Sequence, residues 1–196
     1  MNKTGDQPLW KKNILKKTVN WFACLGLLFW AAHAVAEDES MSEYQIKALF
    51  LLNFTKYVGW PADSFAGGGA PVIIGIYGED RFGDALKKAV EGKSVSGRRI
   101  IIQTIATYDA MGKCNILFIS DSEKNHTGDI LYKIRGLPVL TVGESGQFVD
   151  QGGVINFVEK EGRIRLEINL DAAGQANLQI SSKLLSVADL VKGKAR

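Results

Sequence analysis

The segment from Arg163 to Leu170 reads RIRLEINL and alternates strictly between polar and apolar side chains. Successive side chains of a β-strand point to opposite faces of its sheet, so this alternation predicts a strand with one buried and one polar face. A second strand-like run precedes it, and Glu161 and Gly162 lie between the two as turn residues. We therefore expect an antiparallel hairpin over residues 153–170, which any fold of this chain must accommodate.

Strand-like and helix-like segments alternate before this hairpin. Apolar runs that predict buried strands occupy residues 71–78, 98–105, 115–120 and 138–143. Helical spacing is found in residues 79–92 and in the second half of 122–136, whereas 145–153 is expected to be a turn with a short helix at most. We expect a short helix or turn at 171–177 and a terminal amphipathic helix at 181–191. This order predicts an α/β fold, a three-layer α/β/α sandwich whose mostly parallel sheet carries an antiparallel C-terminal hairpin.

An unusually apolar helix is predicted directly before this pattern. Ser42 and Gln45 form a capping-box sequence, and the helix is expected to end near Val58, before Gly59 and Pro61. Apolar residues surround nearly its whole circumference, so it is either buried on several sides or in contact with another molecule. It is too short and too interrupted to span a membrane. The candidate partner-binding residues around it are Asn53, Lys56, Tyr57 and Trp60.

The N-terminus has the pattern of a secretory signal peptide. Five lysines precede an apolar stretch at residues 21–32, and Ala34 and Ala36 supply small residues at a cleavage site. We expect residues 1–36 to be removed after Ala36, which places the protein in the periplasm; the alternative is an uncleaved anchor. Residues 37–42 are expected to form a mobile tail, followed by a single domain over 43–192.

Composition and motifs argue against several chemistries. The chain carries a net charge of +3, but the leader accounts for more than this, so the rest has no basic patch of the kind that binds nucleic acid. Only Cys114 remains after the leader, which predicts no disulfide. His126 has no partners at metal-ligand spacing, and Ser145 lies in no GxSxG motif. We therefore predict no catalytic site, no metal and no cofactor.

The polar face of the hairpin is a second candidate surface. Arg163, Arg165 and Glu167 lie on one face of the predicted strand. Such a face is either simply solvated or offered to a partner, since arginine is enriched at protein interfaces.

Seven segments together resemble the YfiR-like family of periplasmic regulators. They are YQIKALFLLNFTKYVGWP at 44–61, YGEDRFGDAL, CNILFIS, GLPVLTVGE, GGVINFV, RLEINLDAA and ISSKLLSVA. The resemblance implies a non-catalytic protein that binds the periplasmic region of an inner-membrane diguanylate cyclase and represses it, so controlling cyclic-di-GMP and biofilm formation. It also implies release by an outer-membrane OmpA-like lipoprotein, and self-association into a homodimer.

The chain departs from the family in one respect. Two other functions also remain open at this point. Relatives often carry a cysteine in the first strand, where this chain has Val72–Ile76 without one, so disulfide-based control is not expected here. The chain could instead be a periplasmic small-ligand binding module serving another receptor or kinase, with its ligand at the carboxyl ends of the strands. A hydrolase would need His126 or Ser145 in a pocket with suitable partners.

Overall fold

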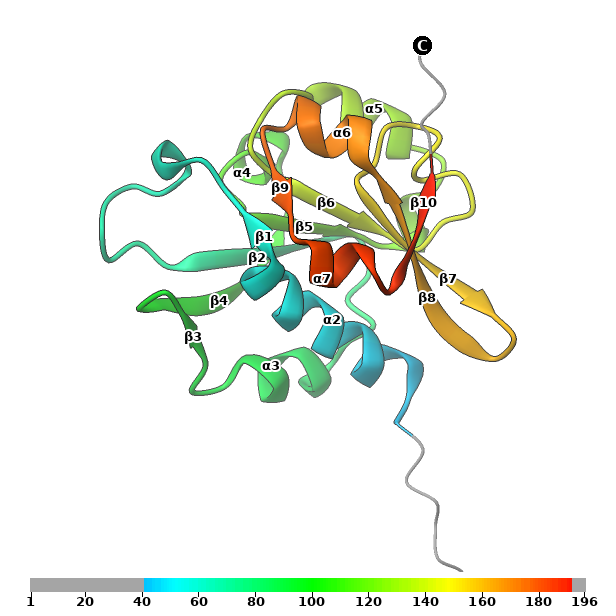
Figure 1. Cartoon of the computed structure of the whole chain (residues 1–196), viewed down its shortest axis with the longest axis horizontal. Helices are drawn as coiled ribbons and strands as arrows, with labels where there is room; N and C mark the ends of the chain where they lie inside the picture. The colour runs from blue at the N-terminus through cyan, green and yellow to red at the C-terminus, as the bar shows by residue number, and fades with distance from the viewer. Residues whose placement is uncertain (1–40, 192–196) are drawn as a thin grey trace, which may run out of the picture. The chain divides into compact units, whose positions relative to one another are not determined.

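The computed structural model describes residues 41–191. The predicted leader, its cleavage site, most of the expected tail and the last residue of the expected domain lie outside the described residues. Figure 1 shows a central sheet with helices on both sides, and this confirms the predicted α/β sandwich.

The sheet has eight strands in the order β10-β8-β7-β6-β5-β2-β4-β3. Their bounds are β2 (Val72–Tyr77), β3 (Ser94–Val95), β4 (Arg98–Ile105), β5 (Ile116–Ile119), β6 (Leu140–Gly143), β7 (Ile155–Lys160), β8 (Arg163–Asn169) and β10 (Ala188–Val191). All neighbours are parallel except β7 with β8 and β3 with β4. The expected hairpin is therefore present. A separate antiparallel pair joins β1 (Val58–Gly59) to β9 (Gln179–Ile180).

Two apolar cores lie on opposite faces of this sheet. The larger one packs Ile74 and Phe118 against α2 (Glu43–Tyr57) and α3 (Asp84–Val90), and the smaller one packs Leu117 and Ile119 against α4 (Tyr108–Met111) and α5 (Thr127–Lys133). Two short helices near the C-terminus, α6 (Leu170–Gln175) and α7 (Ser182–Leu185), also contribute side chains to the larger core. Single 3₁₀ turns occupy Ala62–Ser64 and Asp121–Glu123.

The predicted capping box starts α2. The Ser42 hydroxyl accepts a hydrogen bond from the Gln45 backbone N–H, and the Gln45 side chain accepts one from the Ser42 N–H at 2.6 Å. These bonds satisfy two of the donors that a helix N-terminus leaves free. The helix buries Leu51 and Phe54 completely, whereas Leu49 is 42% exposed, so α2 has one solvent face.

The prediction of a terminal helix over residues 181–191 is wrong. Ser181 caps only the four residues of α7, and the chain then continues as β10, parallel to β8. Pairing with β8 gives the β10 backbone hydrogen-bond partners along a strand that is already in place, which outweighs the weak helical preference of a short segment. Leu190 pairs in register with Ile168 and remains 57% exposed, instead of lying on the buried stripe of a helix.

Candidate functional site

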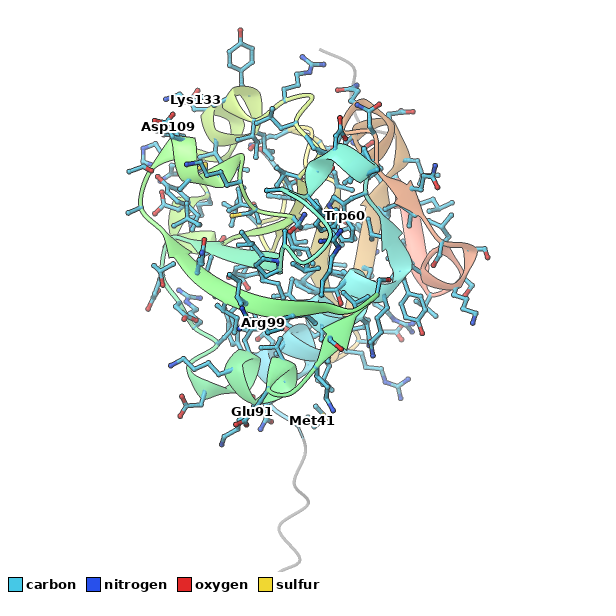
Figure 2. All side chains as sticks on the ribbon, turned by 90° about the vertical axis from the view of Figure 1, so that its left-hand side faces the viewer. Met41, Trp60, Glu91, Arg99, Asp109 and Lys133 are labelled. Atoms are coloured by element: carbon cyan, nitrogen blue, oxygen red, sulfur yellow. The ribbon has the colours of Figure 1, made fainter. Side chains whose placement is uncertain are left out.

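Of the four candidate partner-binding residues near the end of α2, two pack against the domain and two are more accessible. Trp60, labelled in Figure 2, donates its indole N–H to the Asn115 carbonyl at 3.0 Å and is half-buried against the larger core. Tyr57 is half-buried against the larger core. Lys56 is exposed and Asn53 half-exposed. Trp60 and Tyr57 therefore hold the end of the helix, while Asn53 and Lys56 remain on its accessible side.

The predicted hairpin residues lie on the other face of the sheet. Leu166 and Ile168 of β8 enter the core beneath α2, so Arg165 and Glu167, which alternate with them, point to the opposite face. Arg163 and Arg165 are exposed, and Glu167 is half-buried. The structure does not bring the two predicted groups together on one face.

One lysine of the hairpin forms two ion pairs. Lys160 lies 3.4 Å from Glu167 and 2.9 Å from Asp189 of β10. The hydrogen bond between Lys160 and Asp189 raises the pKa of the lysine and lowers that of the aspartate. Asn169, which the alternation places on the polar face, is in fact buried, where its side chain caps α6 through the Ala172 N–H. The solvated part of this face therefore ends at Glu167.

A buried ion pair lies at the carboxyl edge of the parallel sheet. Glu144 directly follows β6, and its carboxylate lies 2.5 Å from the Lys47 ammonium of α2; the two side chains are 5% and 4% exposed. The same carboxylate accepts hydrogen bonds from the Tyr44 hydroxyl at 3.1 Å and from the Asp121 backbone N–H at 3.2 Å. Glu43 pairs with Lys47 from the solvent side. We call Tyr44, Lys47 and Glu144 the edge network.

Burial and pairing act in opposite directions on Lys47. Desolvation by burial lowers its pKa, but the hydrogen bonds to Glu144 and Glu43 outweigh this effect, and the net pKa is raised. Burial raises the pKa of Tyr44 as well. Because the folded pKa of Lys47 exceeds its ordinary value, its contribution to stability is complete at neutral pH and is lost only as the pH rises through that raised value.

The edge network fills the place where this type of sheet usually binds ligands. The order β4-β2-β5-β6-β7 corresponds to the doubly wound order 2-1-3-4-5, in which ligands lie outside the carboxyl ends of the strands. Here Phe82 packs edge-on against Tyr44 at 5.3 Å and against Phe118 at 4.8 Å, with Lys47 and Glu144 beside them. The small-ligand hypothesis placed its ligand at this edge, which protein side chains occupy.

A second arrangement that sequence reasoning missed fixes the loop between β6 and β7. The Phe148 ring is 1% exposed and lies between Gly143 and Gly153, where a Cβ on either glycine would come within 2.2 and 2.1 Å of ring atoms. Buried asparagines hold the same loop: Asn156 donates to the Ser145 carbonyl and Asn169 to the Val149 carbonyl. The Phe148 ring and the side-chain amides of Asn156 and Asn169 therefore hold this loop against the sheet.

The histidine considered for catalysis lies at the surface of the domain. His126 precedes α5 and is largely exposed, 3.7 Å from Glu123. Within residues 41–191, no three His, Cys, Asp or Glu side chains are grouped as metal ligands. Burial raises the pKa of the Cys114 thiol to about 11, so it stays protonated at neutral pH and is a poor nucleophile.

Signals for the missed features are present in the sequence. Lys47 lies on the side of the helix that carries Leu51 and Phe54, and a lysine there must find an acid. Glu144 follows a fully buried strand, and two glycines flank the Phe148 segment. Spacing along the chain could not pair Lys47 with Glu144, which are 97 residues apart.

These features describe an α/β domain with a filled carboxyl edge of the sheet and an accessible first helix. Residues 44–189 match the model of the YfiR/HmsC-like family, DUF4154, and the chain belongs to this family. The family consists of periplasmic regulatory proteins of cyclic-di-GMP signalling, and the expected family membership is thereby confirmed. Within the described residues, no helix has the length and apolarity needed to cross a bilayer.

Two solved structures are similar over part of the chain. One is described as a conserved domain protein from Vibrio cholerae O1 biovar El Tor, at 15% identity and a TM-score of 0.49, covering 61% of this chain and 54% of that one. The other is an ABC domain in complex with L-Trp from Streptococcus pneumoniae, at 11% identity and a TM-score of 0.45, with coverages of 61% and 55%. This chain thus aligns with little more than half the length of either.

Proposed function

We propose that this protein binds the periplasmic sensor region of an inner-membrane diguanylate cyclase and holds the cyclase inactive. The observation that carries the proposal is the family match over residues 44–189. A regulator that binds the inactive conformation more tightly than the active one shifts the equilibrium of the cyclase by that difference in affinity. The functional unit is the domain over 43–192, exported by the leader cleaved after Ala36.

The same proposal includes how repression ends. An OmpA-like lipoprotein of the outer membrane would sequester the regulator. Self-association into a homodimer would also reduce the amount of regulator that is free to bind the cyclase. Cyclic-di-GMP would then rise in the cytoplasm and favour biofilm formation.

Deleting the gene is expected to raise cytoplasmic cyclic-di-GMP, because the cyclase would lose its repressor. The measurement is nucleotide quantification by mass spectrometry in the deletion strain, the parent and a strain complemented in trans. Deleting the cyclase as well should abolish the rise. An unchanged nucleotide level in a strain that normally expresses the protein would contradict the proposal.

The accessible face of α2 is the better candidate for the partner contact. Interface cores are apolar and poor in charge, whereas charged rims mainly affect association rate. Leu49 is 42% exposed on this helix beside Asn53, and Leu190 lies on the same side of the sheet at 57% exposed. On the opposite face, the hairpin presents the charged side chains of Arg163 and Arg165.

Leu49→Arg is expected to weaken binding to the cyclase sensor region at least about tenfold, because it places a charge in the centre of the contact. The charge-reversed pair Arg163→Glu/Arg165→Glu should change mainly the association rate and its salt dependence. Surface plasmon resonance with both variants measures this, and circular dichroism checks that each is folded. If the arginine pair lowered the affinity more than Leu49→Arg does, the partner would contact the hairpin face instead of α2.

A further inference from the structure

The strand β10 forms one edge of the eight-stranded sheet (Figure 1). It pairs with β8 on one side, and within residues 41–191 its backbone takes part in no other backbone–backbone hydrogen bond. The outward N–H and C=O groups of an edge strand are a template for pairing with another chain. β10 therefore presents a backbone surface that a further strand can extend.

The opposite edge of the sheet is protected against such pairing. β3 has only two residues, and it covers the start of β4. The exposed side chains of these two strands are all polar or charged, namely Ser94, Arg99, Gln103 and Thr104. Short strands and charged side chains are the usual devices that keep sheet edges from associating.

The β10 edge lacks these protections. Leu190 is 57% exposed, and Val187, directly before the strand, is 58% exposed. The charge of Asp189 is balanced by Lys160, whose ammonium lies 2.9 Å from the carboxylate. Residues 188–191 include neither a proline nor a lysine. An edge with exposed apolar side chains and a balanced charge favours association over repulsion.

We propose that β10 pairs antiparallel with β10 of a second copy of this chain, which joins the two sheets into one. This inference deepens the proposed function, because it rests on the self-association included there and names its surface. Pairing of two identical edges closes after two copies, whereas pairing of β10 with the protected β3–β4 edge would continue into a fibre.

The sequence of the strand is compatible with itself in one arrangement. A two-fold axis perpendicular to the sheet relates identical antiparallel strands, so residues that lie opposite each other point to the same face. With the axis at Leu190, the two Leu190 side chains are opposite each other, and Asp189 is opposite Val191 of the other copy. Lys192, the next residue in the sequence, comes opposite Ala188 and thus one row from Asp189.

Other arrangements bring like charges together. An in-register parallel pair, or an antiparallel pair centred on Asp189, would place two Asp189 carboxylates side by side, and like charges directly opposite are destabilising. The favoured pair is also short, and small interfaces are typical of transient complexes. We therefore expect a weak dimer, with a dissociation constant on the order of 100 µM.

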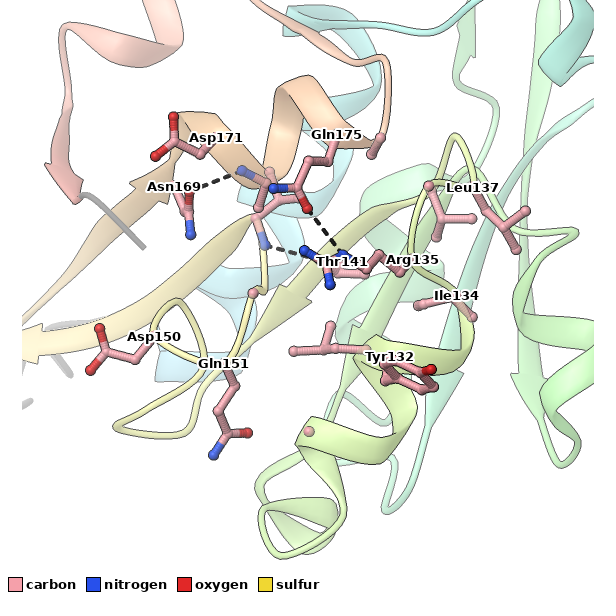
Figure 3. Close-up of a pocket in the computed structure, with 18 of the residues that line it drawn as sticks. Tyr132, Ile134, Arg135, Leu137, Thr141, Asp150, Gln151, Asn169, Asp171 and Gln175 are labelled. Carbon is pink, nitrogen blue, oxygen red and sulfur yellow. Dashed lines mark hydrogen bonds between the residues drawn. The ribbon is translucent and has the colours of Figure 1, made fainter. Parts of the chain in front are cut away.

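Sedimentation equilibrium of the purified protein, with no cyclase present, tests the pairing. We expect a monomer–dimer equilibrium, and amide hydrogen exchange at residues 188–191 should slow as the dimer fraction rises. Leu190→Lys should raise the dissociation constant at least about tenfold, since a lysine protects an edge strand. The matched Leu137→Lys changes another exposed leucine, beside α5 (Figure 3), and should leave the constant within about twofold. Circular dichroism checks that both variants are folded.

Leu190→Cys tests the register. Residues directly opposite in an antiparallel pair have Cα atoms about 4.5–5.5 Å apart, a separation that a disulfide can bridge. Oxidation with copper phenanthroline in air should therefore yield a covalent dimer of Leu190→Cys, but not of Leu137→Cys; the native Cys114 is buried.

Three results would each overturn the proposal. They are a monomer at about 1 mM protein, equal effects of the two lysine variants, and equal crosslinking of the two cysteine variants. Because the cyclase is absent from these experiments, such a result is distinguishable from a failure of the protein to bind the cyclase.

Discussion

Replacing Lys47 with methionine is expected to lower the free energy of unfolding by about 3–5 kcal/mol, because Glu144 would be left buried without its cation. The Glu144 side chain is 5% exposed and its remaining partners are the Tyr44 hydroxyl and one backbone N–H. Neither carries the charge that balances a carboxylate. Urea denaturation followed by circular dichroism measures the loss.

A double variant separates the cost of the unpaired charge from the loss of packing. Lys47→Met/Glu144→Leu removes both charges and keeps apolar volume, and replacing a buried pair in this way is often neutral or stabilising. We expect it to recover most of the stability, less the hydrogen bonds that Tyr44 and Asp121 lose. Lys56→Met, on the exposed side of the same helix, should be neutral. If the double variant were less stable than Lys47→Met, the unpaired charge would not be the cause.

Gly153→Ala is expected to destabilise the protein by about 3 kcal/mol, the upper part of the range for overpacking a core. The added Cβ would lie 2.1 Å from a carbon of the Phe148 ring, which Gly143 confines on its other side. The ring cannot slide away, so it must leave its site and release the loop that Asn156 and Asn169 hold. Thermal unfolding with calorimetry provides the measurement.

Two further variants show whether Phe148 is responsible. Phe148→Ala alone should cost about 3–5 kcal/mol as a buried aromatic truncation, and in its background Gly153→Ala should cost far less. Gly146→Ala is the matched control, since a Cβ there meets nothing within 4 Å. A Gly153→Ala penalty that is unchanged in the Phe148→Ala background would contradict the account.

Local patterns predicted much of this fold. The Ser42 capping box, the buried strands and the hairpin each depend on residues close together in sequence, and each is present. Residues 79–92 were expected to be helical, but α3 covers only Asp84–Val90, after Gly83 at a φ of 54°. The last segment became β10 because a neighbouring strand, not its own spacing, determined its structure.

The functional features were harder to predict, because they depend on distant pairs. The alternation correctly placed Arg163 and Arg165 in solvent, but could not show that Asn169 turns inward to cap α6. Trp60 was a candidate contact residue, and its hydrogen bond to Asn115 is visible only once β5 lies beside it. The edge network and the contacts of Phe148 bring together residues from different elements, and no periodic pattern in the sequence indicates that such residues meet.

The two ends of α2 have consequences for the order in which the chain can fold. The start of the helix is paired with Glu144, and its end continues into β1, whose Val58 pairs with Ile180 of β9. The first helix of the domain thus lacks its final contacts until Glu144 and β9, far along the chain, are in place. Contacts of such high sequence separation form slowly. The domain can therefore close only when both ends of its sequence are present.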